Sequence, residues 1–207
     1  MEIDEHIVYP KMARLKNCKM TITEKIDGTN AQVCIDKGED STLRVVLIGS
    51  RKRVIAPNDG DYKADNFGFA AWVAEHNMAD ALGAGRHYGE WAGPGIQKNP
   101  RNLDRKLFFL FNTNQWDNER LAWAQKMVPD LRVVPIVHEG PFDMGVVDCV
   151  LETLYVTGSK VPDAGPGNAP EGIVVCALGA KFKKTRDDRP KGQQNHDPHG
   201  CRNSWEG

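Results

Sequence analysis

The chain has 207 residues, 40% of them hydrophobic, and a formal net charge of -1. This length and apolar content suit one sizeable domain or a compact bilobed one with a hydrophobic core, and they exclude a wholly disordered chain. A net charge near zero provides no general basic surplus for binding nucleic acid, so any such surface must be local. Candidate basic patches are residues 51–53, 101–106 and 181–189.

The cysteine pattern and the N-terminus bear on the cellular compartment. The five cysteines are widely spaced and form no CxxC pair, which predicts neither a disulfide framework nor a zinc ribbon. The N-terminus lacks a basic-then-apolar signal segment, and no window approaches the roughly 20 apolar residues that cross a bilayer. We therefore expect a cytoplasmic protein without a membrane partner, with its thiols reduced at Cys18, Cys34, Cys149, Cys176 and Cys201.

The first half of the chain is predicted to contain strands and one helix. Apolar and polar residues alternate from Cys18 to Ile35, and Leu43 to Gly49 is a strongly apolar run, so both are predicted to be strands. A helix is predicted from Asp65 to Leu82, with Asp65 as its cap. Its core-facing positions, which recur at helical spacing, are Phe69, Trp72, Val73 and His76.

The second half is predicted to contain two helices around a strand. The helices span residues 118–127 and 143–156, and the strand spans 132–137. The second helix would bury Met144, Val147, Leu151 and Leu154. Residues 159–170 are crowded with Gly, Pro, Asp and Asn and are predicted to form a loop. The whole pattern predicts an α+β fold of antiparallel β-sheets flanked by a few helices, with the site in the cleft between the sheets.

The C-terminal segment differs from the rest in composition. Residues 186–207 are polar and lack apolar periodicity, so we expect one domain over 1–185 followed by a mobile tail. Within the tail, His196, His199 and Cys201 could in principle gather a metal. Their spacing matches no standard zinc finger, and an unstructured terminus is the favoured interpretation.

The segment Thr23-Glu24-Lys25-Ile26-Asp27-Gly28-Thr29-Asn30 places a lysine beside an acid and near a glycine, within the first alternating run. An ordinary lysine, with a pKa of about 10.4, is a poor nucleophile, but burial or neighbouring cations favour its neutral, reactive form. Lys25 is therefore the candidate covalent nucleophile. Taken alone, the Asp-Gly-Thr-Asn stretch would instead favour a hairpin turn.

Further segments follow in a fixed order and change this interpretation. They are Ser50-Arg51, Gly89-Glu90-Trp91-Ala92-Gly93-Pro94-Gly95-Ile96-Gln97, Phe108-Phe109-Leu110-Phe111, Glu171-Gly172-Ile173-Val174-Val175 and Lys181-Phe182-Lys183. From about Ile22 to Lys184, the chain resembles the covalent nucleotidyltransferases, which comprise nucleic-acid ligases and messenger-RNA capping enzymes. Within them it is most similar to the RNA ligase 2 family, and the resemblance implies a nucleotidyltransferase (ligase adenylation) domain.

The charged residues of these segments suit attack on a phosphate. Lys181 and Lys183 share one face of a strand because strand side chains alternate, so both can neutralise the same phosphate and favour the neutral form of Lys25. Glu90 and Glu171 are the acids expected near the ribose and a magnesium ion, which prefers hard oxygen ligands and few protein carboxylates. Glu171 stands at the start of an apolar strand, where a charge is unusual without a role.

The resemblance implies further roles. Lys25 would take the nucleotidyl group, Asn30 and Arg51 would contact the sugar and phosphate, and Glu24 would contact the base. Phe109 and Phe111 share a strand face, and Phe111 is the expected stacking partner of adenine. The cofactors implied are ATP and Mg²⁺, or Mn²⁺ in its place. NAD-dependent ligases use an extra N-terminal domain, whereas only 24 residues precede Lys25, which favours ATP.

The implied reaction has three steps: lysyl-adenylate formation, transfer of AMP to a 5′-phosphate, and attack by a 3′-hydroxyl with release of AMP. The expected substrate is a nick in duplex nucleic acid, held by a monomer mainly through phosphates. Relatives of RNA ligase 2 commonly have histidine two positions after the nucleophile and an added C-terminal domain. This chain has Asp27 there, as DNA ligases do, so the sequence slightly favours DNA over RNA.

Two more remote interpretations remain open. Capping guanylyltransferases share the Lys-x-Asp-Gly pattern but carry a C-terminal oligonucleotide-binding barrel, for which the residues after Lys184 are too few. A non-catalytic module that binds nucleic acid or a nucleotide could also keep the fold. The intact set of Lys25, Glu171, Lys181 and Lys183 argues against that second interpretation.

Overall fold

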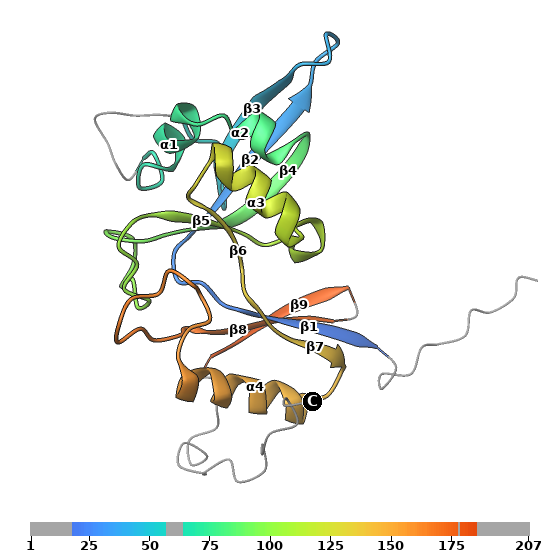
Figure 1. The fold of residues 1–207 in the computed structure, drawn as a ribbon, viewed down its shortest axis with the longest axis vertical. Coiled ribbons are helices and arrows are strands. Elements are labelled where there is room, and N and C mark those ends of the chain that lie inside the picture. Colours follow the sequence, from blue (N-terminus) through green and yellow to red (C-terminus); the bar gives the residue numbers. More distant parts are fainter. Residues whose placement is uncertain (1–17, 57–63, 178, 186–207) are drawn as a thin grey trace, which may run out of the picture.

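The computed structural model describes residues 18–56, 64–177 and 179–185, which form an α+β fold with one sheet above the other (Figure 1). The four-stranded sheet has the order β7-β1-β8-β9, and the five-stranded sheet has the order β3-β2-β4-β5-β6. Their strands are β1 Lys19–Glu24, β2 Thr29–Lys37, β3 Leu43–Ser50, β4 Gly85–Ala92, β5 Leu107–Leu110, β6 Leu131–Val133, β7 Ile136–Pro141, β8 Gly172–Ala177 and β9 Ala180–Thr185. The described strand pairs are antiparallel apart from the parallel pair β5 and β6, so the predicted fold class is confirmed.

The helices are divided between the two sheets. Helices α1 to α3 lie beside the five-stranded sheet, whereas α4 lies under the four-stranded one (Figure 1). Their bounds are α1 Phe69–Glu75, α2 Met78–Leu82, α3 Asn118–Met127 and α4 Met144–Thr157, with a short 3-10 helix η2 at Thr113–Gln115. Each sheet therefore has its own hydrophobic core, built from the inward face of its strands and the helices that cover it.

The helix predicted from Asp65 to Leu82 is two short helices. Asn66 and Phe67 have positive φ angles of 54° and 61°, which delays the start of α1, and the extended backbone at His76 ends it. Asp65 still accepts hydrogen bonds from the backbone N–H groups of Ala70 and Ala71. Of the predicted core positions, Phe69, Trp72 and Val73 are buried and His76 is half-buried.

The two later helices agree closely with the prediction. Asp117 caps α3 by accepting from the N–H of Arg120, and Asp143 caps α4 by accepting from Gly145 and Val146. The buried residues of α4 are Val147, Val150, Leu151 and Leu154. Met144 is 52% exposed, so its predicted burial is wrong, because it lies in the first turn, before the helix reaches the sheet.

Two predicted strands are divided where the chain passes from one sheet to the other. The alternating run from Cys18 to Ile35 contains β1 and β2, which belong to different sheets, with residues 25–28 between them. The predicted strand 132–137 is likewise divided into β6 and β7. A third core fills the junction between the sheets, and its buried members are Ile26, Ala92, Leu103, Leu107, Phe109, Val134 and Val161.

Several other predictions can be compared with the described residues. Residues 159–170 contain no helix or strand, as predicted. Cys18, Cys34 and Cys176 are not disulfide-bonded, but Cys149 is, so the expectation of uniformly reduced thiols is wrong there. Within the described ranges, no helix is both long enough and apolar enough to cross a membrane. The predicted tail, with His196, His199 and Cys201, lies outside the described residues.

Candidate active site

Lys25 begins the segment that passes from β1 in the four-stranded sheet to β2 in the five-stranded sheet. Its backbone N–H donates to the carbonyl of Gly172 over 2.9 Å, which fixes it beside the start of β8. Gly28 ends the segment, and a Cβ there would lie 2.4 Å from the carbonyl oxygen of Trp91. Glycine is therefore required for close approach to β4. The alternative interpretation of this stretch as a hairpin turn is wrong, since β1 and β2 do not pair.

The Lys25 side chain forms an ion pair with Glu171. Its Nζ lies 2.5 Å from Oε1 of Glu171, and the two side chains are 22% and 29% exposed. Glu171 immediately precedes β8, and its carbonyl oxygen accepts a hydrogen bond from the hydroxyl of Tyr155 on α4. Its second carboxylate oxygen, Oε2, is buried and has no hydrogen-bond partner among the described residues. Such an orphaned acceptor is what a ligand or cation could satisfy.

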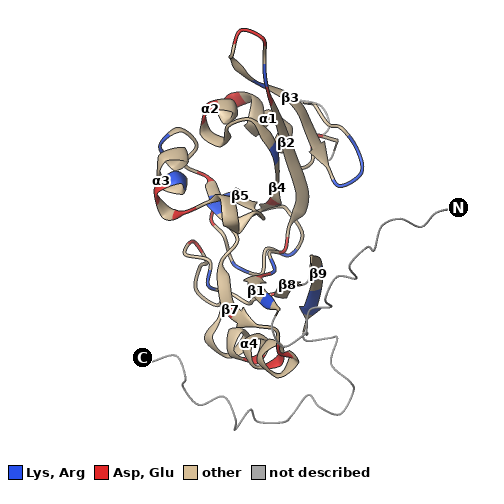
Figure 2. Ribbon diagram, turned by 90° about the vertical axis from the view of Figure 1, so that its right-hand side faces the viewer, with Lys and Arg blue, Asp and Glu red and all other residues tan. Residues whose placement is uncertain are grey.

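Lys181 and Lys183 lie on the same face of β9, as predicted. Their backbone partners on β8 are Cys176 and Val174, and all four residues line the same cleft. Figure 2 shows the lysines of β9 in blue, in the strand beside β8. Lys184 points to the opposite face, where its Nζ pairs with Asp148 of α4. The alternation of β9 thus separates two cleft lysines from one structural lysine.

Glu90 and Asn30 face each other across β4 and β2. The Asn30 side-chain amide donates to Oε2 of Glu90 over 2.9 Å, and Glu90 is 9% exposed. Burial raises the pKa of Glu90 from 4.5 to about 7, against the opposing effects of Lys25 and the Asn30 hydrogen bond. Glu171 and Asp27 add to the rise through their negative charges. Glu90 is therefore close to half-protonated near neutral pH.

A cleft of about 740 Å³ brings most of the predicted site residues together between the two sheets. The predicted residues that line it are Glu24, Lys25, Asn30, Arg51, Glu90, Phe111, Lys181 and Lys183. Glu171 joins this set through its ion pair with Lys25. The chain therefore gathers, in one cavity, residues that come from both sheets and are as far apart in sequence as Lys25 and Lys183.

The structure distinguishes the two candidate aromatic residues. Phe109 is fully buried in the core between the sheets. Phe111 directly follows β5, is half-buried and lines the cleft. Its backbone N–H donates to the carbonyl of Tyr88 over 2.9 Å, which extends the pairing of β4 and β5 by one residue. Phe111 is thus the accessible ring of the pair.

Glu24 has a different environment from the one expected. Its carboxylate accepts from Arg101 Nε at 2.9 Å, from the Ser159 hydroxyl at 2.7 Å and from the Lys160 backbone N–H at 2.7 Å. The Glu24 side chain is 0% exposed and that of Arg101 is 1% exposed. The carboxylate is thus held by protein partners even though Glu24 lines the cleft, and its contact with the base stays a prediction.

Arg101 is a residue whose position the sequence did not reveal. Its guanidinium also donates to the carbonyl oxygen of Lys25, so one buried side chain holds both Glu24 and the backbone of the candidate nucleophile. Residues 101–106 were a candidate basic patch, but Arg101 is buried, Arg105 pairs with three aspartates and Lys106 donates to the Phe67 carbonyl. This patch is therefore structural. Residues 51–53 are exposed, as a basic patch requires.

Glu90 and Glu171 fit a cation bound through few protein ligands. No group of three or more His, Cys, Asp or Glu residues in the described ranges could hold a metal by itself. Mg²⁺ is commonly bound by one or two carboxylates together with water and phosphate oxygens. The Oε2 of Glu171 has no partner among the described residues, and burial raises the pKa of Glu90 to about 7, so a cation bound beside either carboxylate would stabilise its ionised form.

The solved structures that resemble this chain share its fold. The apo form of an RNA ligase mutant from Naegleria gruberi has 17% sequence identity and a TM-score of 0.55, over 83% of this chain and 50% of that one. Two further mutants of that ligase, one with ATP and Mn and one with AMP and Mn, have 16% identity, TM-scores of 0.53 and the same coverage. The chain thus spans about half the length of these ligases.

Sequence comparison identifies the family directly. No protein with a curated description matches the chain. The RNA ligase family, in contrast, matches residues 19–189, which include each described strand, both crossings between the sheets and the residues of the cleft. The chain therefore belongs to the RNA ligase family.

Proposed function

We propose that this protein is an ATP-dependent polynucleotide ligase that works through a covalent lysyl-adenylate on Lys25. The observation that carries the proposal is the convergence of Lys25, Glu90, Lys181 and Lys183 in one cleft, with Glu171 bonded to Lys25. This set supplies a nucleophile, cations for a phosphate and carboxylates for a metal ion. Membership in the RNA ligase family supports the same assignment.

In the first step, the neutral amine of Lys25 attacks the α-phosphorus of ATP. The Nζ–P bond forms as the bond from the α-phosphorus to the bridging oxygen breaks, and pyrophosphate leaves with that electron pair. The two cleft lysines stabilise the negative charge on the phosphoryl oxygens. In the ion pair with Glu171, Lys25 is an ammonium whose lone pair is bound to a proton. Before attack it must therefore separate from the carboxylate and lose that proton to solvent. A divalent metal, when bound, would supply further charge neutralisation at the phosphates.

The adenosine would lie along the upper side of the cleft. Phe111 offers its ring to the adenine, Asn30 and Glu90 offer polar groups to the ribose, and Arg51 offers a cation to the phosphates. Glu24 would act indirectly, because its hydrogen bonds to Arg101, the Ser159 hydroxyl and the Lys160 backbone N–H fix the end of β1 beside Lys25. We assign residues 1–185 to the nucleotidyltransferase domain, acting as a monomer.

In the second step, the AMP moves from Lys25 to the 5′-phosphate of a strand, which forms a P–O–P bond and breaks the Nζ–P bond. In the third, a 3′-hydroxyl attacks that 5′-phosphate and AMP leaves. We take an RNA strand in a nicked duplex as the first substrate to test, because the family match favours RNA. Asp27 supports nicked DNA as the second candidate, since DNA ligases share that residue of the motif.

Incubation with ATP labelled at the α-phosphate, in the presence of magnesium, tests the covalent step. Wild-type protein should keep the label after denaturation, and Lys25→Ala should not. Lys184→Ala is the matched control, because this lysine faces α4 and should be labelled normally. Equal labelling of wild type and Lys25→Ala would refute the lysyl-adenylate. Labelling with GTP in place of ATP would support a capping-type enzyme, and no labelling at all would support a binding module.

Nicked duplexes that differ only in the sugars beside the nick test the substrate. Sealing of a ribose 3′-end with no sealing of a deoxyribose 3′-end would establish the RNA assignment. The reverse result would support the DNA candidate and the importance of Asp27. Each substrate is compared at several salt concentrations, since phosphate contacts dominate affinity and weaken with salt.

A further inference from the structure

A second cavity continues from the cleft along the outer face of the five-stranded sheet. It has a volume of about 480 Å³, within the range of small-molecule and cofactor sites. Five residues line both cavities, namely Asn30, Arg51, Phe111, Asn112 and Lys181. The second cavity therefore opens directly onto the place where the phosphate chemistry is proposed, and whatever it holds lies next to the reacting phosphate.

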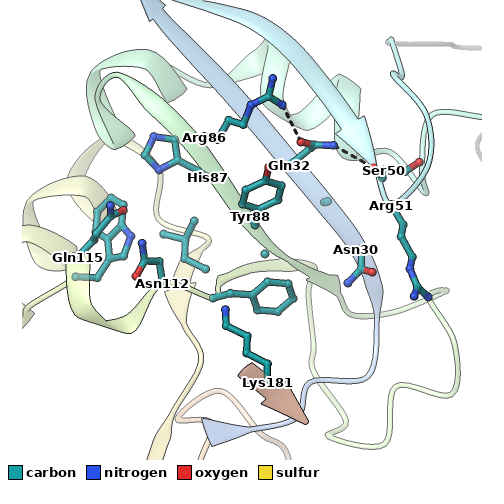
Figure 3. A pocket seen from close by; sticks show the side chains of 15 residues that line it. Asn30, Gln32, Ser50, Arg51, Arg86, His87, Tyr88, Asn112, Gln115 and Lys181 are labelled. Atoms are coloured by element: carbon teal, nitrogen blue, oxygen red, sulfur yellow. Dashed lines mark hydrogen bonds between the residues drawn. The ribbon is translucent and has the colours of Figure 1, made fainter. Parts of the chain in front are cut away.

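The described lining of this second cavity, here called the upper pocket, contains basic residues but no acidic ones. Its cations are Arg51, Arg86 and Lys181, and no described residue that lines it is Asp or Glu. The whole chain, in contrast, has a net charge of -1. Figure 3 shows Arg86 at the upper end of the pocket and Lys181 entering from β9 at the lower end. Cations at both ends and no acid between them favour an anionic ligand with more than one negative group.

Tyr88 provides a flat surface between these cations. It lies on β4 opposite Gln32 of β2, and its side chain points outward, with 51% of its surface exposed. Tyr88 and Phe111 are neighbours across the extended β4–β5 pairing and therefore share this face of the sheet. Figure 3 shows the Tyr88 ring near the middle of the pocket. An exposed ring beside cations is the arrangement on which single-stranded bases stack.

The rim next to Tyr88 is held by a chain of hydrogen bonds. Arg86 donates to the Gln32 side-chain oxygen over 3.4 Å, and the Gln32 amide donates to the Ser50 carbonyl over 3.3 Å (Figure 3). A Cβ on Gly49 would meet the Gln32 side chain at 2.8 Å, so the glycine leaves room for it. The position of Arg86 is thus tied to β2 and β3, while its remaining N–H groups can still donate to a phosphate.

We propose that this upper pocket binds the terminal nucleotide of the strand that carries the 5′-phosphate, with its base stacked on Tyr88 and its next phosphate beside Arg86. This inference rests on the proposed ligase function and adds a substrate subsite to it. The group at the shared rim is an anionic phosphate in this donor strand but a neutral hydroxyl in the acceptor strand. The acid-free, cationic rim formed by Arg51 and Lys181 therefore suits the donor strand.

Direct binding tests the subsite without any covalent step. The probe is a labelled nicked duplex with or without the 5′-phosphate, and the readout is fluorescence anisotropy. Tyr88→Ala should weaken binding of the phosphorylated duplex by about 5- to 150-fold, the range for loss of one stacked base. Tyr88→Phe should keep most of the affinity because the ring remains. Trp123→Ala is the matched control, since Trp123 on α3 is also 51% exposed but does not line the pocket.

Arg86→Ala tests the phosphate contact. It should weaken binding and reduce the slope of log affinity against log salt by about 0.9, the contribution of one phosphate contact in duplex DNA. Arg44→Ala is its control, because Arg44 lies on β3 of the same sheet but pairs with Asp40 and does not line the pocket. An unchanged slope in Arg86→Ala would contradict the predicted phosphate contact.

Single-turnover kinetics separate this inference from the proposed function. Tyr88→Ala and Arg86→Ala should form the lysyl-adenylate at the wild-type rate and lose only AMP transfer to the 5′-phosphate at low strand concentration. Slower adenylation would overturn the inference, because the pocket would then serve ATP or its leaving pyrophosphate. A defect confined to sealing of a pre-adenylated strand would assign the pocket to the acceptor strand and also overturn it. If wild type forms no adenylate but the binding results hold, the proposed function fails and the subsite stands.

Discussion

Lys25 and Glu171 form an ion pair of 2.5 Å, at the point where the chain leaves the four-stranded sheet after β1 and just before β8 begins. The carboxylate holds the amine inside the cleft, and its other oxygen, Oε2, has no described partner. Under the proposed function, Glu171 would position the proposed nucleophile before substrate binds and then accept a different cation. Release of the amine and binding of a metal ion would be two parts of one exchange at the same carboxylate.

Replacement of Glu171 tests this exchange. Glu171→Gln keeps the size and a hydrogen-bond acceptor but removes the negative charge that would bind a metal. We expect adenylation to slow by about a hundredfold, as for loss of one strong electrostatic contact, and to require more Mg²⁺ for half-maximal rate. The measurement is the single-turnover rate across a magnesium titration. Glu119→Gln, an exposed residue of α3, should match wild type, and an unchanged magnesium requirement in Glu171→Gln would contradict the proposed metal contact.

The strand β9 offers a comparison of lysines on its two faces. Lys181→Ala and Lys183→Ala each remove a cleft cation and should reduce the adenylation rate by about 10²- to 10³-fold. Lys184→Ala removes an ion pair with Asp148 that is partly exposed, so it should leave the rate unchanged and change the free energy of unfolding by less than about 1 kcal/mol. Labelling rates and urea unfolding are measured on all three. Similar rate losses in all three variants would mean that the adenylation rate depends on the total positive charge of β9, and would contradict a specific role for Lys181 and Lys183.

The pKa of Glu90 predicts a pH dependence of stability. Burial raises the folded-state pKa from 4.5 to about 7, so between these values the native protein binds a proton that the unfolded chain has lost. The stabilisation is fully present below about pH 4.5 and is lost as the pH rises through 7. Since Gln does not titrate, the free energy of unfolding of wild type relative to Glu90→Gln should fall by about 2–3 kcal/mol from pH 5 to pH 8.

Urea unfolding of both proteins at pH 5 and pH 8 measures this difference. In Glu90→Gln, Asn30 can donate to the new side-chain amide oxygen as it does to the carboxylate, so the substitution preserves the hydrogen bond across β2 and β4. A second variant, Asp36→Asn, changes an exposed carboxylate of β2 and should show no such trend. A difference between wild type and Glu90→Gln that stays constant from pH 5 to pH 8 would mean that Glu90 is ionised throughout this range.

The predicted site residues that line the cleft could be named from the sequence because they lie in short contiguous motifs. The alternation that placed Lys181 and Lys183 on one face is a local property of a strand. The capping of α3 by Asp117 and of α4 by Asp143 is likewise a local property of a helix start. Local rules of this kind hold wherever tertiary contacts do not override them. Alternation alone could not show which of Phe109 and Phe111 is accessible, because it places both on the same face. Phe109 is buried only because it packs into the core between the two sheets.

The crossings between sheets were not predictable by the same rules. Ile26 continues the apolar alternation of β1, but it is buried in the core between the sheets rather than in a strand, so the pattern concealed the break. The divided helix after Asp65 depends on positive φ angles at Asn66 and Phe67, which no residue type there demands. The partners of Glu24 lie 77 and 135 residues away along the chain, and no spacing rule connects them.

The buried pair of Arg101 and Glu24 supports a final prediction. Arg101→Met removes the cation, leaves the Glu24 carboxylate buried with only Ser159 and Lys160 as partners, and frees the Lys25 carbonyl. Breaking a buried ion pair in this way costs about 3–5 kcal/mol, so the free energy of unfolding should fall by that amount. The double variant Arg101→Met with Glu24→Gln should recover part of the loss, because no uncompensated charge remains. Urea unfolding of the two single variants and the double variant measures the coupling. Equal and additive losses would show that the pair contributes no mutual stabilisation and that β1 is held at Lys25 by other contacts.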